Sequence, residues 1–177
     1  MNKTSMRTRP GLDEEDEVLD QQAQYLTVRL GDESYALGLL SVKEIIEYGG
    51  VTQVPMMPPY VRGVINLRGR VVPVVDLMRR LLGTPSVLNR RSCIVIVEVG
   101  SVDERQDMGV IVDAVSQVVE IPPSQVEPGP SFGARLRADF IAGMGRQDGG
   151  FVIMLDIERV LNAEDIEALG ELAAASV

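Results

Sequence analysis

The chain has 177 residues, of which 45% are hydrophobic and 24% are charged, so it can bury one core or two small lobes that share a core. It contains no histidine and one cysteine, Cys93, which excludes histidine-based acid–base catalysis, histidine metal ligands, an intrachain disulfide and a multi-cysteine zinc site. A net charge of −9 argues against nucleic acid as the main partner. Since neither a signal peptide nor a membrane-spanning apolar run is recognisable, we expect a cytoplasmic protein without direct membrane insertion.

Charge is unevenly distributed along the chain. Residues 62–91 carry seven arginines and one aspartate, a balance of +6, whereas residues 92–177 carry five arginines and fifteen acidic residues, a balance of −10. This pattern fits either ordinary solvated surfaces or a molecule with one basic and one acidic face that meets other proteins in a fixed orientation. Residues 1–20 hold few apolar side chains and an acidic run, Asp13–Glu17, so we expect a disordered acidic tail there.

Short β-rich segments predict a mainly β fold. Residues 24–30 alternate apolar and polar side chains, which predicts a half-buried strand. Further strands are expected at residues 34–40, 64–67, 71–75, 92–99, 108–115, 118–121 and 151–155. Such a number of short strands, with turn signals between them, is typical of a barrel or sandwich, although no internal repeat is evident. Asn162 is expected to cap a closing helix that bears Ile166, Leu169 and Leu172.

The segment after the second strand predicts a short helix. Ser41 and Glu44 have the spacing of a capping box, in which each side chain bonds the other residue's backbone N–H. An apolar stripe at helical spacing follows: Val42, Ile45 and Ile46. Gly49 then provides a stop signal, so we predict a helix that begins at Ser41 and ends before Gly49.

The most informative stretch of the chain is residues 60–83. Two Val- and Ile-rich segments flank Arg68–Gly69, where glycine supplies the φ > 0 conformation that a tight hairpin turn needs. Pro73 has no N–H for a sheet ladder, so the second strand is expected to lie at an edge or to carry a bulge. A short helix from Asp76 to Leu82 is expected to end at Gly83. The stretch contains no nucleophile–base pair, metal-ligand set or phosphate-binding loop, which favours a binding module.

A series of segments runs in order through the chain: Gln24–Glu33, Val42–Ile46, Val51–Pro55, Tyr60–Gly69, Val72–Leu77, Gly109–Val115 and Phe140–Gly145. This series resembles the CheW family, the bacterial chemotaxis coupling proteins, over roughly residues 22–172. The resemblance implies a mainly β fold with two SH3-like five-stranded β-barrel subdomains around a shared apolar core, a few short helices and a C-terminal helix. Residues 21–177 would then form one CheW-like domain, with the two intertwined subdomains in roughly its first and second halves.

The resemblance also implies a function. Members of the family are non-catalytic adaptors that couple the cytoplasmic helical tips of chemoreceptors to the regulatory domain of a chemotaxis-type histidine kinase in a two-component signalling array. We therefore expect these two partners, a monomer that assembles into receptor–kinase arrays, no cofactor and no metal. The alternative is a regulatory protein-interaction module of a non-motility chemosensory pathway.

Local patterns and the resemblance together mark candidate partner-binding residues: Val42, Glu44, Gly63, Arg68, Gly69, Val115 and Val118. Arg68 either pairs with an acidic group such as Asp76 to hold the turn or presents a guanidinium fork to a partner's carboxylate. Gly63 and Gly69 meet backbone requirements, so bulky replacements would distort the interface through the fold. Val115 and Val118 either pack in the core or line a groove that receives receptor helices.

Two other classes of protein stay open on the sequence alone. An enzyme would use a carboxylate pair such as Asp113 with Glu120 or Asp156 with Glu158, but no pattern gathers a base, an orienting group and an oxyanion donor. The other class is a domain that regulates a kinase within its own chain, or that belongs to an adaptor with a phosphoacceptor receiver. Little sequence follows the closing helix, so we expect a standalone adaptor instead.

Overall fold

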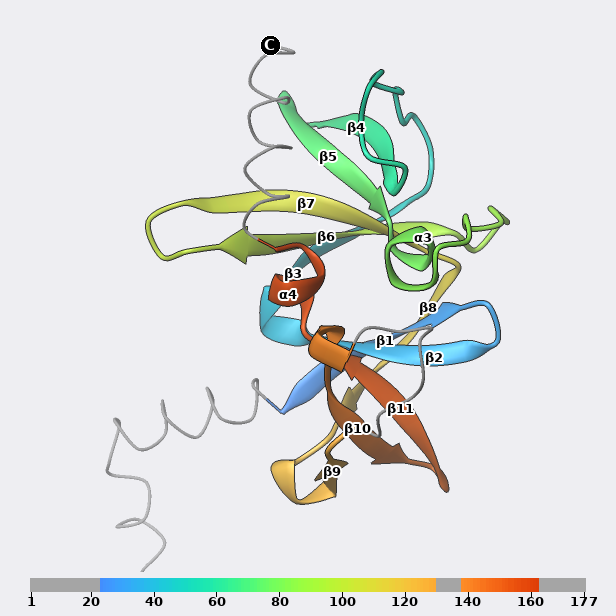
Figure 1. Ribbon diagram of the computed structural model, residues 1–177, viewed down its shortest axis with the longest axis vertical. Coiled ribbons are helices and arrows are strands. Elements are labelled where there is room, and N and C mark those ends of the chain that lie inside the picture. Colours follow the sequence, from blue (N-terminus) through green and yellow to red (C-terminus); the bar gives the residue numbers. More distant parts are fainter. Residues whose placement is uncertain (1–22, 130–137, 163–177) are drawn as a thin grey trace, which may run out of the picture.

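The computed structural model describes residues 23–129 and 138–162, and these residues form two mixed β-sheets (Figure 1). One sheet has six strands in the order β8-β1-β2-β11-β10-β9. Its strands are β1 (Gln24–Leu30), β2 (Glu33–Gly38), β8 (Ala114–Glu120), β9 (Val126–Glu127), β10 (Ile141–Gln147) and β11 (Gly150–Leu155). This sheet takes strands from both ends of the described chain, so the two sheets do not follow the order of the sequence.

The other sheet has five strands in the order β3-β6-β7-β5-β4, all from the middle of the chain. Its strands are β3 (Val42–Glu47), β4 (Val61–Leu67), β5 (Arg70–Asp76), β6 (Cys93–Gly100) and β7 (Arg105–Val112). Short helical segments connect the strands: α3 (Leu77–Leu82), α4 (Ile157–Val160) and the 3₁₀ turns η1 (Leu39–Ser41), η2 (Pro123–Gln125) and η3 (Ala138–Phe140). The mainly β fold with few short helices is therefore confirmed, and the two-residue β9 brings one sheet to six strands where five were expected.

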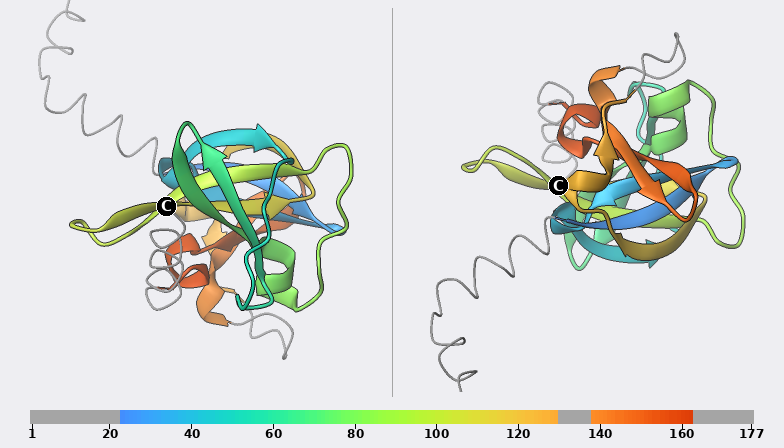
Figure 2. Two further views of the ribbon diagram at one scale, coloured as in Figure 1. Left: turned by 90° about the horizontal axis from the view of Figure 1, so that it is seen from above. Right: turned by 90° about the horizontal axis from the view of Figure 1, so that it is seen from below.

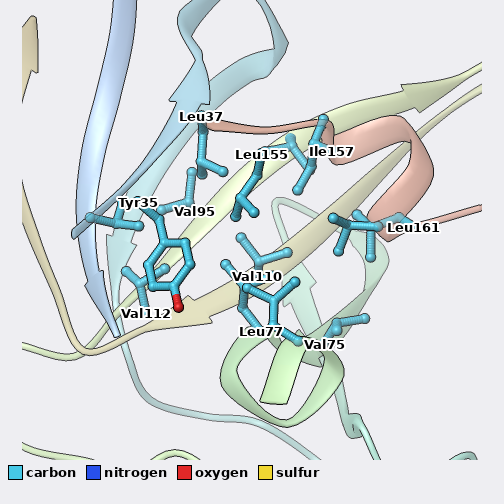
Figure 3. Close-up of a cluster of buried hydrophobic side chains, with 14 of the residues drawn as sticks. Tyr35, Leu37, Val75, Leu77, Val95, Val110, Val112, Leu155, Ile157 and Leu161 are labelled. Atoms are coloured by element: carbon cyan, nitrogen blue, oxygen red, sulfur yellow. The ribbon is translucent and has the colours of Figure 1, made fainter. Parts of the chain in front are cut away.

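The central strands are buried on both faces, because each sheet encloses a small core of its own and packs its other face on a shared core. In β6, for example, Val95 and Val97 belong to the shared core, whereas Ile94 and Ile96 belong to the core inside the five-stranded sheet. Burial on both sides explains why this strand reads as a continuous apolar run. Figure 3 shows side chains from both sheets and both α-helices meeting in the shared core. Each fully buried aliphatic side chain contributes about 1.5–3 kcal/mol, so this core is a main attachment between the sheets.

Several local predictions are confirmed. The strand at residues 24–30 has the predicted bounds, and Arg68 and Gly69 form the predicted hairpin turn with φ values of 52° and 86°. Helix α3 begins at its cap Asp76, whose side chain accepts a hydrogen bond from the Arg79 N–H at 3.3 Å. It ends at Gly83, where φ is 83°. The tail at residues 1–20 and the closing helix lie outside the described residues.

The predicted helix after Ser41 is wrong, because residues 42–47 form strand β3, which pairs antiparallel with β6. The side chains in β3 alternate between half-buried and exposed, as expected for a strand with one face on a core. An isolated helix of this length is marginal in water, and the same apolar spacing also suits a strand. Pairing with β6 therefore decides the conformation, and the capping box does not form.

Two further differences concern the hairpins. Strand β5 lies between β4 and β7 and is not an edge strand. Its pairing with β7 includes only Val74–Asp76, so Pro73 lies just outside that ladder, and the bulge of the hairpin is at Arg62 in the opposite strand. Strand β10 was not predicted, because Ala142, Gly143 and Gly145 give it a weak β signal.

The structure contains an internal repeat that was not evident in the sequence. The β4–β5 hairpin and the β10–β11 hairpin correspond residue by residue at a separation of 80 positions (141 − 61 = 80). The matched features are a bulge at Arg62 and Ala142, a turn at residues 68–69 and 148–149, and a helix cap at Asp76 and Asp156.

The remaining strands extend this correspondence. Strand β5 pairs in parallel with β7, and its counterpart β11 pairs in parallel with β2. On the other side, β7 pairs antiparallel with β6, and β2 pairs antiparallel with β1. The outermost pairs, β3 with β6 and β8 with β1, each carry a bulge. We call the five-stranded sheet with α3 the first unit and the six-stranded sheet with α4 the second unit.

Candidate partner-binding site

An exposed ion pair stands where β3 approaches the β4–β5 turn of the first unit. The Arg68 guanidinium donates two hydrogen bonds to the Glu44 carboxylate, one from Nη1 to Oε2 at 3.1 Å and one from Nη2 to Oε1. The Arg68 side chain is 70% exposed and the Glu44 side chain 29% exposed. Arg68 therefore pairs with Glu44 rather than with Asp76, and Glu44 serves in this pair rather than in a helix cap.

The pair keeps both groups ionised over a wide pH range. The hydrogen bond from Arg68 lowers the pKa of Glu44, and the hydrogen bond to Glu44 raises the pKa of Arg68. A bidentate arginine–carboxylate pair has a fixed planar geometry, so it also fixes the distance between β3 and the turn. The outer face of the guanidinium remains open to solvent.

A second group of charges lies beside this pair. Asp107 of β7 accepts hydrogen bonds from Lys43 at 3.1 Å and from Arg70. Its carboxylate is 7% exposed, whereas the Lys43 and Arg70 side chains are 43% and 61% exposed. These residues surround a hollow of about 200 Å³, lined by Lys43, Glu44, Leu67, Arg68, Arg70, Ile96 and Asp107. Sequence reasoning missed Lys43, Arg70 and Asp107, because only the sheet pairing brings positions 43, 70 and 107 together.

A buried carboxylate holds the β4–β5 hairpin at the end opposite its turn. Asp76 is 2% exposed and accepts hydrogen bonds from Arg62 Nη2 at 2.8 Å, Ser86 Oγ at 2.6 Å and the Ser86 N–H at 2.9 Å. Burial raises the pKa of Asp76, but the hydrogen bonds from Ser86, Arg62 and Arg79 lower it more strongly, so the net pKa is below its ordinary value. The network ties β4, α3 and the loop after α3 together at the end of the hairpin opposite the turn.

Gly63 allows a loop to lie close against β4. The Thr52 N–H and carbonyl bond the Val64 backbone at 2.8 and 2.9 Å. A Cβ at Gly63 would collide with the Thr52 carbonyl group, lying 2.7 Å from its carbon, and φ at Gly63 is 151°. Gly69 faces open space and is required only by its positive φ. Both glycines therefore act through the backbone, as the sequence suggested.

Two of the three apolar candidates lie on β8, at the edge of the second unit, and the third, Val42, lies on β3. Val115 is half-buried and packs against the shared core, whereas Val118 is 49% exposed. A bulge separates them, and there Thr27 Oγ1 donates to the Gln117 carbonyl at 2.8 Å and accepts from its N–H at 3.1 Å. The bulge turns the side chains on either side of it to different environments.

The internal repeat relates these apolar residues to those of β3. Val42 pairs with Val97 before the bulge of β3, as Val115 pairs with Val28 before the bulge of β8. Counting past each bulge, Ile45 corresponds to Val118, and both are exposed, at 43% and 49%. The candidate residues therefore divide into two equivalent edge strands, one in each unit.

The carboxylate pairs that an enzyme would need are not brought together. Asp113 precedes β8 and accepts a hydrogen bond from the Gly31 N–H at 2.7 Å, whereas Glu120 lies at the far end of that strand. Asp156 caps α4, and Glu158 accepts a hydrogen bond from the Gly100 N–H at 3.1 Å. Within residues 23–129 and 138–162, no cluster of three or more acidic or cysteine side chains is suited to hold a metal ion. Over the same ranges, no helix is long and apolar enough to cross a membrane.

The molecule has two β units with exposed edge strands. One edge bears an arginine–carboxylate pair and the other bears apolar side chains, an arrangement typical of protein-binding modules. Comparison with known proteins gives the family. The model of the CheW-like domain matches residues 24–165, and the chain belongs to the CheW family of non-catalytic scaffolding proteins of chemotaxis signal transduction.

Individual relatives agree with this assignment. The chain is 30% identical over 159 residues to the chemotaxis protein CheW of Treponema pallidum, covering 88% of this chain and 91% of that protein. It is 29% identical over 150 residues to the chemotaxis protein CheW of Klebsiella aerogenes, covering 85% and 88%. The crystal structure of the scaffolding protein TtCheW from Thermoanaerobacter tengcongensis matches with a TM-score of 0.71 at 29% identity, covering 81% of this chain and 90% of that one.

Proposed function

We propose that this protein couples the cytoplasmic helical tips of chemoreceptors to the regulatory domain of a chemotaxis-type histidine kinase. The observation that carries the proposal is the presence of two equivalent edge strands with different surfaces in one chain. An adaptor must bind two partners at the same time, and each of its binding surfaces must discriminate between them. Edges that share a backbone geometry but differ in charge meet both requirements.

In this proposal the first edge contributes the Glu44–Arg68 pair with Val42 beside it, and Gly63 and Gly69 keep the backbone shape of β4 and of the turn that carries Arg68. The second edge contributes Val115 and Val118. An exposed valine beside half-buried ones is the kind of anchor that the apolar face of an amphipathic helix uses. An arginine fork with an open face suits a carboxylate on a partner protein.

The test is ternary co-sedimentation of the full chain with receptor cytoplasmic fragments and the cognate kinase. The amount of kinase in the receptor pellet measures bridging. Arg68→Ala is expected to reduce bridging by at least about fivefold, the effect of losing an interface contact worth about 1 kcal/mol. Arg146→Ala is the matched control, because Arg146 is 65% exposed and also bonds a glutamate, Glu127, from a β-hairpin.

The apolar edge is tested in the same assay. Val118→Asp places a charge at an exposed position and is expected to abolish bridging without disturbing the shared core. Val102→Asp is its control, because Val102 is 91% exposed and lies in the β6–β7 turn. Val115→Asp is less informative, because Val115 also packs against the shared core.

A charge exchange separates two roles for the ion pair. The double variant Glu44→Arg/Arg68→Glu keeps an arginine–glutamate pair between β3 and the turn but moves the fork. If the pair serves only to hold the edge in shape, the exchange preserves bridging; if the fork binds a partner's carboxylate, the exchange abolishes it. Bridging that survives Arg68→Ala and Val118→Asp would remove these residues from the interface. Absence of bridging by the parent chain with its cognate partners would overturn the function itself.

A further inference from the structure

One arginine lies at the joint between the two units. Arg80 belongs to α3 of the first unit, and its Nε donates a hydrogen bond to the carbonyl of Val160, in α4 of the second unit, at 2.8 Å. Its guanidinium also lies over two aromatic rings, 4.6 Å from the centroid of Tyr60 and 5.1 Å from that of Phe140. Figure 2 shows α3, η3 and α4 on the same side of the molecule, where these contacts are made.

The two rings that Arg80 contacts occupy equivalent positions in the internal repeat. Tyr60 and Phe140 are 80 positions apart and occupy equivalent places, since the carbonyl of each accepts a hydrogen bond from the helix cap of its own unit. The Asp76 N–H donates to Tyr60 at 2.7 Å, and the Asp156 N–H donates to Phe140 at 2.9 Å. The guanidinium of Arg80 therefore contacts one aromatic ring from each unit.

The residue equivalent to Arg80 is Val160, again 80 positions along, and its carbonyl is the acceptor. Arg80 therefore has no charged counterpart in the second unit, because valine occupies the equivalent position. A second arginine there would bring two like charges together, which is unfavourable in a partly buried site.

The hydrophobic effect that drives formation of the shared core is itself non-directional, so directional contacts across the joint restrict the angle between the units further. A hydrogen bond and the stacking of a planar guanidinium on two rings are directional. A second polar contact crosses the joint on the solvent side, from the Gly100 N–H to Glu158, whose side chain is 46% exposed. Arg80 joins both units from the half-buried side.

We propose that Arg80 is the positioning residue that fixes the angle between the two units. It thereby holds the two candidate edge strands in the mutual orientation that simultaneous binding of two partners needs. This second statement rests on the proposed function, whereas the first does not.

The first statement is tested by pulsed electron–electron double resonance on the free protein. Spin labels are placed at Glu47→Cys and Glu120→Cys, which are exposed and equivalent positions at the ends of β3 and β8, after Cys93→Ser. The parent is expected to give one narrow distance distribution. Arg80→Met is expected to lose it and give a broad one. Arg79→Met is the matched control, since it removes a charge from the same helix and the structure gives the Arg79 side chain no ion pair within the described residues.

A parent-like width in Arg80→Met, with circular dichroism confirming that it folds, would overturn the proposal. If Arg80→Met fails to fold, Arg80→Lys decides. It keeps the cation but lacks the guanidinium plane and Nε, so it is also expected to broaden the distribution, and a parent-like width would refute the proposed role.

The co-sedimentation assay tests the second statement. Arg80→Met is expected to keep binary binding to receptor fragment and to kinase and to lose bridging, while Arg79→Met keeps all three. Full bridging by Arg80→Met would overturn the link to function. If the parent itself shows no bridging, the proposed function fails, and the distance measurement still decides the role of Arg80.

Discussion

Replacement of Asp76 by alanine removes the acceptor at the centre of the network that holds the end of the β4–β5 hairpin opposite its turn. The carboxylate is 2% exposed and accepts hydrogen bonds from Arg62, from both the N–H and the hydroxyl of Ser86, and from the Arg79 N–H. The change leaves the Arg62 guanidinium, whose side chain is only 24% exposed, without its anion.

The internal repeat supplies a matched control for the magnitude. Asp156 occupies the equivalent position and makes the same cap, accepting from the Arg159 N–H at 3.3 Å, but its side chain is 36% exposed. Loss of a helix cap costs about 1 kcal/mol, which is the expected effect of Asp156→Ala. Breaking a buried ion pair from one side costs about 3–5 kcal/mol, and partial hydration of Arg62 places Asp76→Ala near the lower end, at about 3 kcal/mol.

The assay is urea unfolding at pH 7, with the free energy of unfolding compared between variants whose m values agree. Asp76→Ala is expected to lose about 2 kcal/mol more than Asp156→Ala. Equal losses in the two variants would refute the reasoning, because they would show that the buried network adds nothing to the cap. Arg62→Ala alone and in combination with Asp76→Ala completes a double-mutant cycle, in which a coupling near zero would have the same meaning.

The lowered pKa of Asp76 also predicts a pH dependence. Since the folded-state pKa is below the unfolded one, which is about 3.9, the unfolded state binds more protons between the two values. The stabilisation is therefore complete above the unfolded pKa and is lost as the pH falls through the folded pKa. Asp76→Asn is expected to show a shallower loss of stability below about pH 4 than the parent, measured as the thermal midpoint in an acid series. Parallel curves would contradict the assigned pKa shift.

Three further predictions concern β4, the β4–β5 turn and the ion pair between this turn and β3. Gly63→Ala is expected to lower the free energy of unfolding in urea by about 3 kcal/mol, because it combines a positive φ with a collision against Thr52. Gly69→Ala has only its positive φ to accommodate and is expected to lower the same free energy by about 1 kcal/mol. In Arg68→Ala the pKa of Glu44, followed by NMR, is expected to rise toward its ordinary value; an unchanged pKa would show that the ion pair does not persist in solution. Partner binding is expected to weaken with ionic strength and to do so less in Arg68→Ala, so equal salt dependence of the two proteins would contradict a charged contact at this residue.

Those parts of the fold that depend on local backbone chemistry could be predicted from the sequence. The alternation at residues 24–30, the glycine at the β4–β5 turn and the short helix with its stop at Gly83 each specify a conformation within a few residues. The missing histidine and scarce cysteine bounded the chemistry, and an ordered series of motifs indicated the family, which the comparisons established.

The internal repeat was out of reach because the fold demands identity at few positions. Identical residues in the two hairpins are Gly63 and Gly143, Gly69 and Gly149, Val72 and Val152, and Asp76 and Asp156. The turn glycines supply a positive φ, the other glycine pair allows a close neighbouring backbone, and the aspartates cap helices. Elsewhere the buried positions need only apolar side chains of suitable size, so the sequences diverged while the backbones stayed alike.

Only the tertiary structure decided between conformations and between partners. Val42–Glu47 satisfies both a helical stripe and a strand alternation, and pairing with β6 makes it a strand. The sequence offers Arg68 several carboxylates, and the meeting of β3 with the β4–β5 turn assigns it Glu44, while Arg62 takes Asp76. The place of Arg80 between rings 80 positions apart follows in the same way from the packing of the two units. Neighbouring residues determine the local backbone geometry. Ion pairs and the joint between the units depend on contacts between residues far apart in the chain, and no short segment of sequence contains both partners.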